Sequence, residues 1–114
     1  MKNGIKHGYL EGYLYTLDGP VEDRNGNKFW YKDGLRHRLD GPAIECADGE
    51  KQYWVNGKLH RTDGPAVYMN GHYYWYLNDN LHRVDGPAID MESGTKKWYI
   101  NDMLHRDDGP AIEN

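Results

Sequence analysis

The sequence predicts an all-β fold, an antiparallel meander of tandem β-hairpin repeats of about 23 residues each. Three observations support this prediction. The phrase Leu-His-Arg-x-Asp-Gly-Pro-Ala-Ile recurs four times with small changes, and a fixed period of this length is typical of repeat arrays. Asn-Gly, Asp-Gly and related turn dipeptides recur in two alternating series, which favours hairpins. No long stretch has the apolar spacing of an amphipathic helix, so helix is expected to be negligible.

The repeated phrase also predicts the domain organisation. Four regular repeats cover residues 28–114, and residues 1–27 are interpreted as a degenerate first repeat that caps the array, because repeat arrays need atypical terminal units. The chain of 114 residues is therefore expected to form a single repeat domain. The histidines of the four phrases are His37, His60, His82 and His105, spaced by 23, 22 and 23 residues.

Each repeat is expected to contain two strands and two turns. Asn, Asp and Gly tolerate the positive φ angles that tight hairpin turns require. The proline of each Asp-Gly-Pro step lacks an N–H group, so one strand of each repeat should be broken or bent there. The first turn series is Asp33-Gly34, Asn56-Gly57, Asn78-Asp79 and Asn101-Asp102, and the second is Asn25-Gly26, Asp48-Gly49, Asn70-Gly71 and Ser93-Gly94.

Composition limits the function classes. A net charge of −4 argues against sequence-independent nucleic-acid binding, which needs a basic surface. The single cysteine excludes a disulfide within the chain and favours a reducing compartment. No signal peptide is visible and no apolar run approaches the roughly 20 residues that span a bilayer, so a cytoplasmic protein without membrane contact is expected.

One stretch resembles a known repeat family. Residues 53–60, Tyr-Trp-Val-Asn-Gly-Lys-Leu-His, resemble MORN-type β-hairpin repeats, with Arg-x-Asp-Gly-Pro-Ala in place of the family's Gly-x-Gly. The phrase also resembles Leu-His-Arg-x-Asp-Gly-Pro-Ala arrays in uncharacterised proteins of large phages and bacteria. The resemblance covers roughly residues 28–114 and implies a contact module, not an enzyme. It further implies an accessory phage or bacterial protein that binds and modulates, or inhibits, a host or defence protein.

The third of the four regular repeats, counted from residue 28, carries the predicted binding site, and the repeats are numbered in this way below. It is aromatic where the second and fourth repeats have Glu50-Lys51-Gln52 and Thr95-Lys96-Lys97. A scaffold does not need this departure, and rigid aromatic side chains are common in protein interfaces. Another protein is therefore the expected partner. The predicted binding residues are Tyr68, His72, Tyr73, Tyr74, Trp75 and Tyr76.

An alternative function uses the repeat arginines. They could hold an anionic small molecule such as a signalling nucleotide, with Tyr or Trp stacked on its base. The scaffold interpretation pairs each arginine with the aspartate two residues later, or gives that aspartate backbone N–H groups at its own turn. Arginines sequestered by their aspartates would weaken the alternative. The arginines concerned are Arg38, Arg61, Arg83 and Arg106.

No metal site, cofactor or catalytic residue is predicted. Equivalent histidines in successive hairpins should lie roughly 9–10 Å apart, too far to converge on one ion, so they are expected to be buried and hydrogen-bonded. No nucleophile–base arrangement, carboxylate pair or phosphate-binding loop stands out. The short last strand, ending at Glu113-Asn114, leaves an edge through which a homodimer could form.

Overall fold

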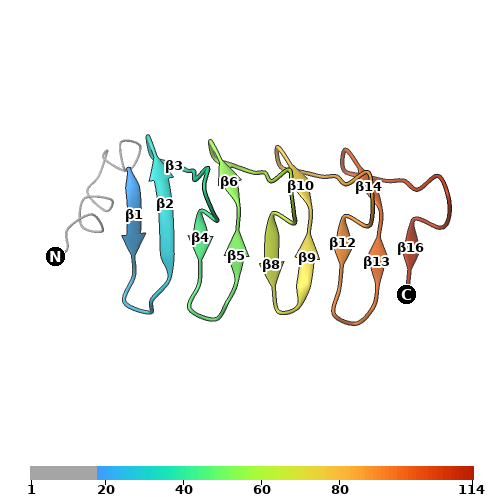
Figure 1. Ribbon diagram of the computed structural model, residues 1–114, viewed down its shortest axis with the longest axis horizontal. Helices are drawn as coiled ribbons and strands as arrows, with labels where there is room; N and C mark the ends of the chain where they lie inside the picture. Colours follow the sequence, from blue (N-terminus) through green and yellow to red (C-terminus); the bar gives the residue numbers. More distant parts are fainter. Residues whose placement is uncertain (1–17) are drawn as a thin grey trace. The chain divides into compact units, whose positions relative to one another are not determined.

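The computed structural model describes residues 18–114, and all of their regular structure is β-strand (Figure 1). The prediction of an all-β hairpin meander is confirmed. The chain divides into two compact units, Met1–Lys58 (unit 1) and Leu59–Asn114 (unit 2). Most of the predicted cap, residues 1–17, lies outside the described residues. No helix in the described part of the chain is long and apolar enough to cross a bilayer.

Unit 1 shows the predicted pairing of one long strand with one broken strand. The five-residue strand β2 pairs with β1 along one edge; along the other edge it pairs first with β4 and then with β3. Strand β5 continues the antiparallel order beyond β4. The strands are β1 (Gly19–Glu22), β2 (Lys28–Lys32), β3 (Leu35–Arg36), β4 (Ile44–Glu45), β5 (Lys51–Gln52), β6 (Trp54–Val55) and β7 (Lys58–Leu59), and the division between the units falls within β7.

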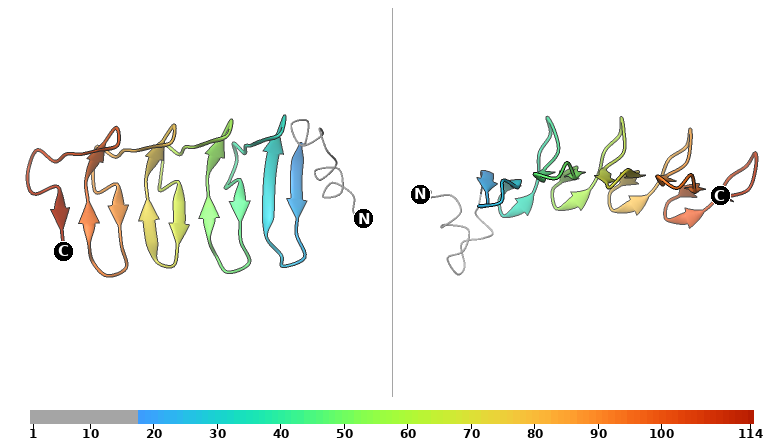
Figure 2. Two further views of the ribbon diagram at one scale, coloured as in Figure 1. Left: turned by 180° about the vertical axis from the view of Figure 1, so that it is seen from behind. Right: turned by 90° about the horizontal axis from the view of Figure 1, so that it is seen from below.

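Unit 2 is a five-stranded antiparallel sheet with two short hairpins. The sheet order is β8-β9-β12-β13-β16, and the hairpins are β10–β11 and β14–β15 (Figures 1 and 2). The strands are β8 (Val67–Met69), β9 (His72–Tyr74), β10 (Tyr76–Leu77), β11 (Asn80–Leu81), β12 (Ile89–Asp90), β13 (Lys96–Lys97), β14 (Tyr99–Ile100), β15 (Met103–Leu104) and β16 (Ile112–Glu113).

The second turn series contains two loop lengths. In the second repeat, Cys46 N–H donates to Glu50 O, and Gly49 N–H donates to Cys46 O, both at 2.9 Å. This is a three-residue loop that ends on a glycine with φ of 100°, the position where a type I turn is followed by a left-handed residue. The loop at residues 92–94 has the same pair of hydrogen bonds.

The third repeat instead has a two-residue loop. Met69 and His72 are direct cross-strand partners. Asn70 and Gly71, between them, both have positive φ, 54° and 81°, as a type I′ turn requires. The shorter loop accounts for the one 22-residue spacing in the histidine series, because it removes one residue without shifting the strand register.

The fully buried side chains are small and few. Each buried pair follows an Asp-Gly-Pro step, and its alanine has no exposed surface. Ala88 illustrates the cause of this burial. Its N–H donates to Lys97 O at 2.8 Å and its O accepts from Trp75 N–H at 2.7 Å, so the residue is held between two neighbouring chain segments. A larger side chain has little room there. The buried pairs are Ala43–Ile44, Ala66–Val67 and Ala88–Ile89.

The loop at residues 24–26, the first loop of the second turn series, is held by the carboxylate of Asp23. Asp23 Oδ1 accepts from the N–H groups of Asn25 and Asn27 at 2.9 and 3.0 Å, and Oδ2 accepts from the Asn27 side-chain amide. The backbone bond from Asn27 is the main reason that the pKa of Asp23 lies below its usual value of 3.8, although desolvation acts in the opposite direction. A lowered folded-state pKa stabilises the protein above the usual pKa, and this contribution is lost as the pH falls through the folded-state pKa.

We therefore expect the Asp23 carboxyl to titrate below pH 3.8 in a carbon-detected NMR titration of the folded chain. Protection of the Asn27 amide from exchange should fall over the same pH range. Asp23→Asn, which cannot titrate, is the control and should remove that pH dependence. A midpoint at or above 3.8 would contradict the role given to these hydrogen bonds.

Candidate functional site

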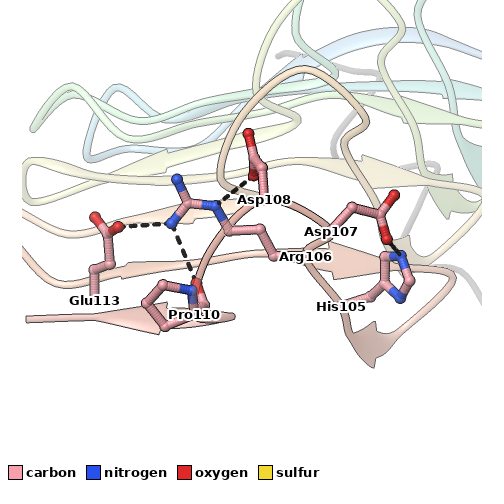
Figure 3. Close-up of polar contacts among 6 residues, drawn as sticks. All are labelled: His105, Arg106, Asp107, Asp108, Pro110 and Glu113. Atoms are coloured by element: carbon pink, nitrogen blue, oxygen red, sulfur yellow. Dashed lines mark hydrogen bonds and ion pairs between the residues drawn. The ribbon is translucent and has the colours of Figure 1, made fainter.

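The repeat arginines are bonded within their own repeats. Figure 3 shows the fourth: Arg106 Nε donates to Asp108 Oδ1 at 3.0 Å, and its Nη1 donates to Pro110 O at 3.2 Å and Glu113 Oε2 at 2.6 Å. The pattern closes the Asp-Gly-Pro loop with a charge-assisted bond at each end. The other Nε–Oδ1 pairs are Arg38–Asp40, Arg61–Asp63 and Arg83–Asp85, at 2.9–3.0 Å, each with an Nη1 bond of 3.1 Å to the proline carbonyl.

Three of these guanidinium groups also stack on tryptophan. Arg83 Cζ lies 3.8 Å from the centroid of a Trp75 ring, and the corresponding distances are 3.9 Å for Arg38 on Trp30 and 3.7 Å for Arg106 on Trp98. Such stacking is a cation–π contact. The loop glycine makes room for it, since a Cβ at Gly86 would lie 2.7 Å from Arg83 Cζ.

This arrangement matches the predicted Arg–Asp ion pair and bears on the small-molecule alternative. The Nε and Nη1 donors of all four arginines are engaged within the chain, which weakens the hypothesis that they hold an anion. The aspartates are largely exposed and contact the arginines. In the first repeat, the Arg38 guanidinium holds the pKa of Asp40 below its usual value.

The histidines hold the next turn. Asn56 N–H donates to His37 Nδ1 at 3.0 Å, and the same bond joins Asn78 to His60 and Asn101 to His82 at 3.1 Å. The predicted hydrogen bonding is confirmed, but the predicted burial is wrong. The first three histidines are half-buried and His105 is exposed, because they lie beside turn tips and not between strands.

Two aspartates that were predicted only as turn residues have a larger role. Asp79 N–H donates to Leu59 O at 2.8 Å, and Asp79 Oδ1 accepts from Leu59 N–H at 2.7 Å. Asp102 makes the same two bonds with Leu81. Both aspartates have φ near 70°, a region that glycine would occupy without strain. The sequence feature that points to this role is an acidic residue at a turn position that favours glycine. The aspartate carboxylate accepts the extra hydrogen bond, which glycine could not do.

Replacing Asp102 with alanine should destabilise unit 2 by about 1–3 kcal/mol, since alanine keeps the strained φ and loses the acceptor. Asp102→Asn is the matched control, because asparagine tolerates positive φ and keeps a carbonyl oxygen, and it should cost less than about 0.5 kcal/mol. Chemical denaturation of both variants measures the difference. Equal losses would mean that the Leu81 bond contributes nothing.

The predicted aromatic site divides into exposed and structural residues. Tyr68 and Tyr73 are direct cross-strand partners, with ring centroids 5.0 Å apart and planes inclined by 41°. Tyr73 is 41% exposed. On the other side of Tyr73, strand β12 places Asp90 in register, and Asp90 forms a 3.0 Å ion pair with Lys96. An aromatic pair thus adjoins a charged pair along one cross-strand row.

The remaining predicted residues belong mainly to the scaffold. Tyr74 is in register with Val67 and Ile89, both buried, so it lies on the core side of the sheet. His72 Nδ1 accepts from the backbone N–H of Glu92 at 3.1 Å. Trp75 lies under the Arg83 guanidinium. Tyr76 is half-buried, and burial, followed by nearby acidic groups, raises its pKa.

A small acidic cluster surrounds the one cysteine. Among residues 18–114, potential ligand atoms of Cys46, Asp48 and Glu50 lie within 4.8 Å of one another. Each carboxylate already accepts a hydrogen bond in the loop: Asp48 from Glu50 N–H and Glu50 from the Gln52 side chain. Burial, followed by both carboxylates, raises the pKa of the Cys46 thiol, which disfavours the thiolate that binds metals.

Comparison with protein-family models, curated proteins and solved structures finds no match to this chain. The resemblance to MORN-type repeats therefore stays a prediction.

Proposed function

We propose that the chain is a non-enzymatic binding module whose protein partner docks over Tyr68 and Tyr73. One observation carries the proposal: Tyr73 is 41% exposed, and its ring packs against Tyr68 on the surface of unit 2. An exposed, mutually supported tyrosine pair offers a large contact area with few rotatable bonds to immobilise on binding.

The other repeats supply the comparison that supports this role. Where the third repeat has Tyr73, they have Lys28, Lys51 and Lys96. The hairpin scaffold therefore forms with lysine at this position, and the tyrosine is not needed to fold the repeat. Tyrosine is enriched and lysine is depleted in protein interfaces, so the substitution runs in the direction expected of a binding surface. A phage or bacterial accessory protein that modulates a host protein remains our expectation for the biological role.

The test is Tyr73→Lys, which places the residue of the other repeats in the third. Stability should change by less than about 1 kcal/mol, as for surface substitutions generally. Affinity for a partner captured by the wild-type chain should fall tenfold or more, a loss of about 1.4 kcal/mol. Calorimetric isotherms and thermal melts on the same samples measure both.

Lys28→Ala, at the equivalent position of the first repeat, is the matched control and should retain full affinity. Undiminished binding by a folded Tyr73→Lys variant would place the binding surface elsewhere.

A further inference from the structure

A row of alternating charges crosses the sheet in unit 1. Cross-strand partners in register share one face of a sheet, and along this row an acid and a lysine alternate. The row consists of Glu22, Lys28, Glu45 and Lys51. Glu45 therefore has a lysine in register on each side. Opposite charges that face each other across strands stabilise a sheet, so this carboxylate is balanced from both directions.

Unit 2 has the same row with one pair of charges replaced. Its residues in register are Tyr68, Tyr73, Asp90, Lys96 and Glu113, on strands β8, β9, β12, β13 and β16 (Figure 1). In the other hairpins of the second turn series, an acid faces a lysine across the strands. In the third repeat both members of the pair are tyrosine, so the acid and the lysine have been exchanged together for an aromatic pair.

This replacement leaves Asp90 with a lysine on one side only. Lys96 Nζ donates to Asp90 Oδ1 at 3.0 Å. Among residues 18–114, no hydrogen-bond donor reaches the other carboxylate oxygen, Oδ2. The Asp90 side chain is 37% exposed. On its other side, where Glu45 has a second lysine, Asp90 has Tyr73, which is 41% exposed.

An exposed tyrosine ring beside a carboxylate with an unused oxygen suits an arginine side chain. A planar guanidinium can stack on an aromatic face and donate in its own plane to a carboxylate, whereas a lysine ammonium is a compact, strongly hydrated charge. The chain itself makes this combination elsewhere: Arg83 stacks on Trp75 and donates to Asp85. Tyr73 and Asp90 therefore offer, on the surface, the two acceptor groups that the repeat arginines use within the chain.

We propose that the partner docking over Tyr68 and Tyr73 presents an arginine whose guanidinium stacks on the Tyr73 ring and donates to Asp90 Oδ2. This inference rests on the function proposed above and names the chemistry of its partner. The net charge of −4 favours the approach of a basic surface. The equivalent carboxylate of unit 1, Glu45, has a lysine of the chain itself on each side, so it needs no cation from a partner.

The test begins with a library of random displayed peptides selected on the full-length chain. The Tyr73→Lys variant is used to remove peptides that bind elsewhere; it deletes the ring and gives Asp90 the second lysine that Glu45 has. We expect the peptides that require Tyr73 to be enriched in arginine, and not in lysine, over the starting library. Tyr73-dependent peptides without this enrichment overturn the arginine inference alone. If no selected peptide requires Tyr73, the inference and the proposed docking surface both fail.

Calorimetric titration of one Tyr73-dependent peptide then tests the contact itself. Replacing its arginine with citrulline, a neutral residue of nearly the same shape, should weaken binding about tenfold, as expected for loss of one charge-assisted hydrogen bond. Asp90→Asn should weaken binding of the arginine peptide by a similar factor and leave the citrulline peptide unchanged, because the two changes remove the same interaction.

Two further variants separate this contact from a general effect of charge. Lys96→Gln removes the ammonium that competes for Asp90, so it should strengthen binding of the arginine peptide. Glu45→Gln, at the equivalent position of unit 1, is the matched control and should leave the affinity unchanged. Thermal melts on the same samples show that each variant is folded. Equal affinities of the arginine and citrulline peptides, or equal losses for both peptides in Asp90→Asn, would overturn the inference.

Discussion

Replacing Arg83 with alanine is expected to destabilise unit 2 by about 2–4 kcal/mol, more than any other single substitution proposed for this chain. The side chain makes a charge-assisted bond to Asp85, a second bond to the Pro87 carbonyl, and a stack on Trp75. The part-buried, charge-assisted bond to the Pro87 carbonyl contributes about 1.5–3 kcal/mol, and the pair with the exposed Asp85 carboxylate contributes less than about 1 kcal/mol. Chemical denaturation followed by tryptophan fluorescence gives the free energy of unfolding.

Asp85→Ala is the control for the ion pair alone. The sequence was also compatible with an aspartate that accepts backbone N–H groups at its own turn. Loss of such an acceptor would cost about 1–3 kcal/mol of stability. The structure gives Asp85 a largely exposed carboxylate bonded to Arg83 Nε, so the expected loss is below about 1 kcal/mol. Equal losses for the two variants would show that the stack and the proline carbonyl contribute nothing.

Gly86→Ala should destabilise unit 2 by about 1–3 kcal/mol through overpacking. Gly86 is not among the residues with positive φ, so an added side chain meets no left-handed backbone strain there. The added Cβ would instead lie 2.7 Å from Arg83 Cζ and 3.0 Å from its Nε. The guanidinium is held by three contacts and cannot withdraw without losing them.

A double-mutant cycle tests that steric clash. In an Arg83→Ala background the obstacle is gone, and Gly86→Ala should cost less than about 0.5 kcal/mol, so the two effects are strongly non-additive. Gly94→Ala is the matched control: its φ is 99° and no atom lies within 4 Å of the added Cβ, so its cost is backbone strain. That cost should be the same in both backgrounds. Additive effects at Gly86 and Arg83 would show that the clash is not the cause.

The hairpins could be predicted from the sequence because turn dipeptides act locally. The positive φ angles at Asn56, Asn70 and Asn101 fall where the dipeptides place them. The partners of the turn residues could not be predicted in this way. Asp102 bonds to a residue 21 positions upstream, in the preceding repeat; its own hairpin indicates that the carboxylate has a role, but not which residue it contacts.

The candidate site shows the same division. The sequence singled out a run of aromatic residues, but their exposure depends on which face each strand position takes. Tyr73 and Tyr74 are neighbours, and the register with Tyr68 and Val67 puts one on the surface and the other on the core side. The Asn-Gly dipeptide at residues 70–71 predicts a turn, but not which face of the sheet each flanking residue takes, because that is set by the pairing of β9 with β8 and β12.

The unequal loops have a consequence for how such chains diversify. Strand register is normally the least forgiving property of a sheet, since a slip by one residue turns every side chain to the opposite face. Here the third repeat has one residue fewer than its neighbours, the difference lies in the bend at residues 70–71, and Val67 and Tyr74 are still cross-strand partners. The bends of this series are therefore tolerant positions. A recombined, lengthened or grafted segment placed there would leave the ladder in phase, so new recognition elements can be acquired without redesigning the scaffold.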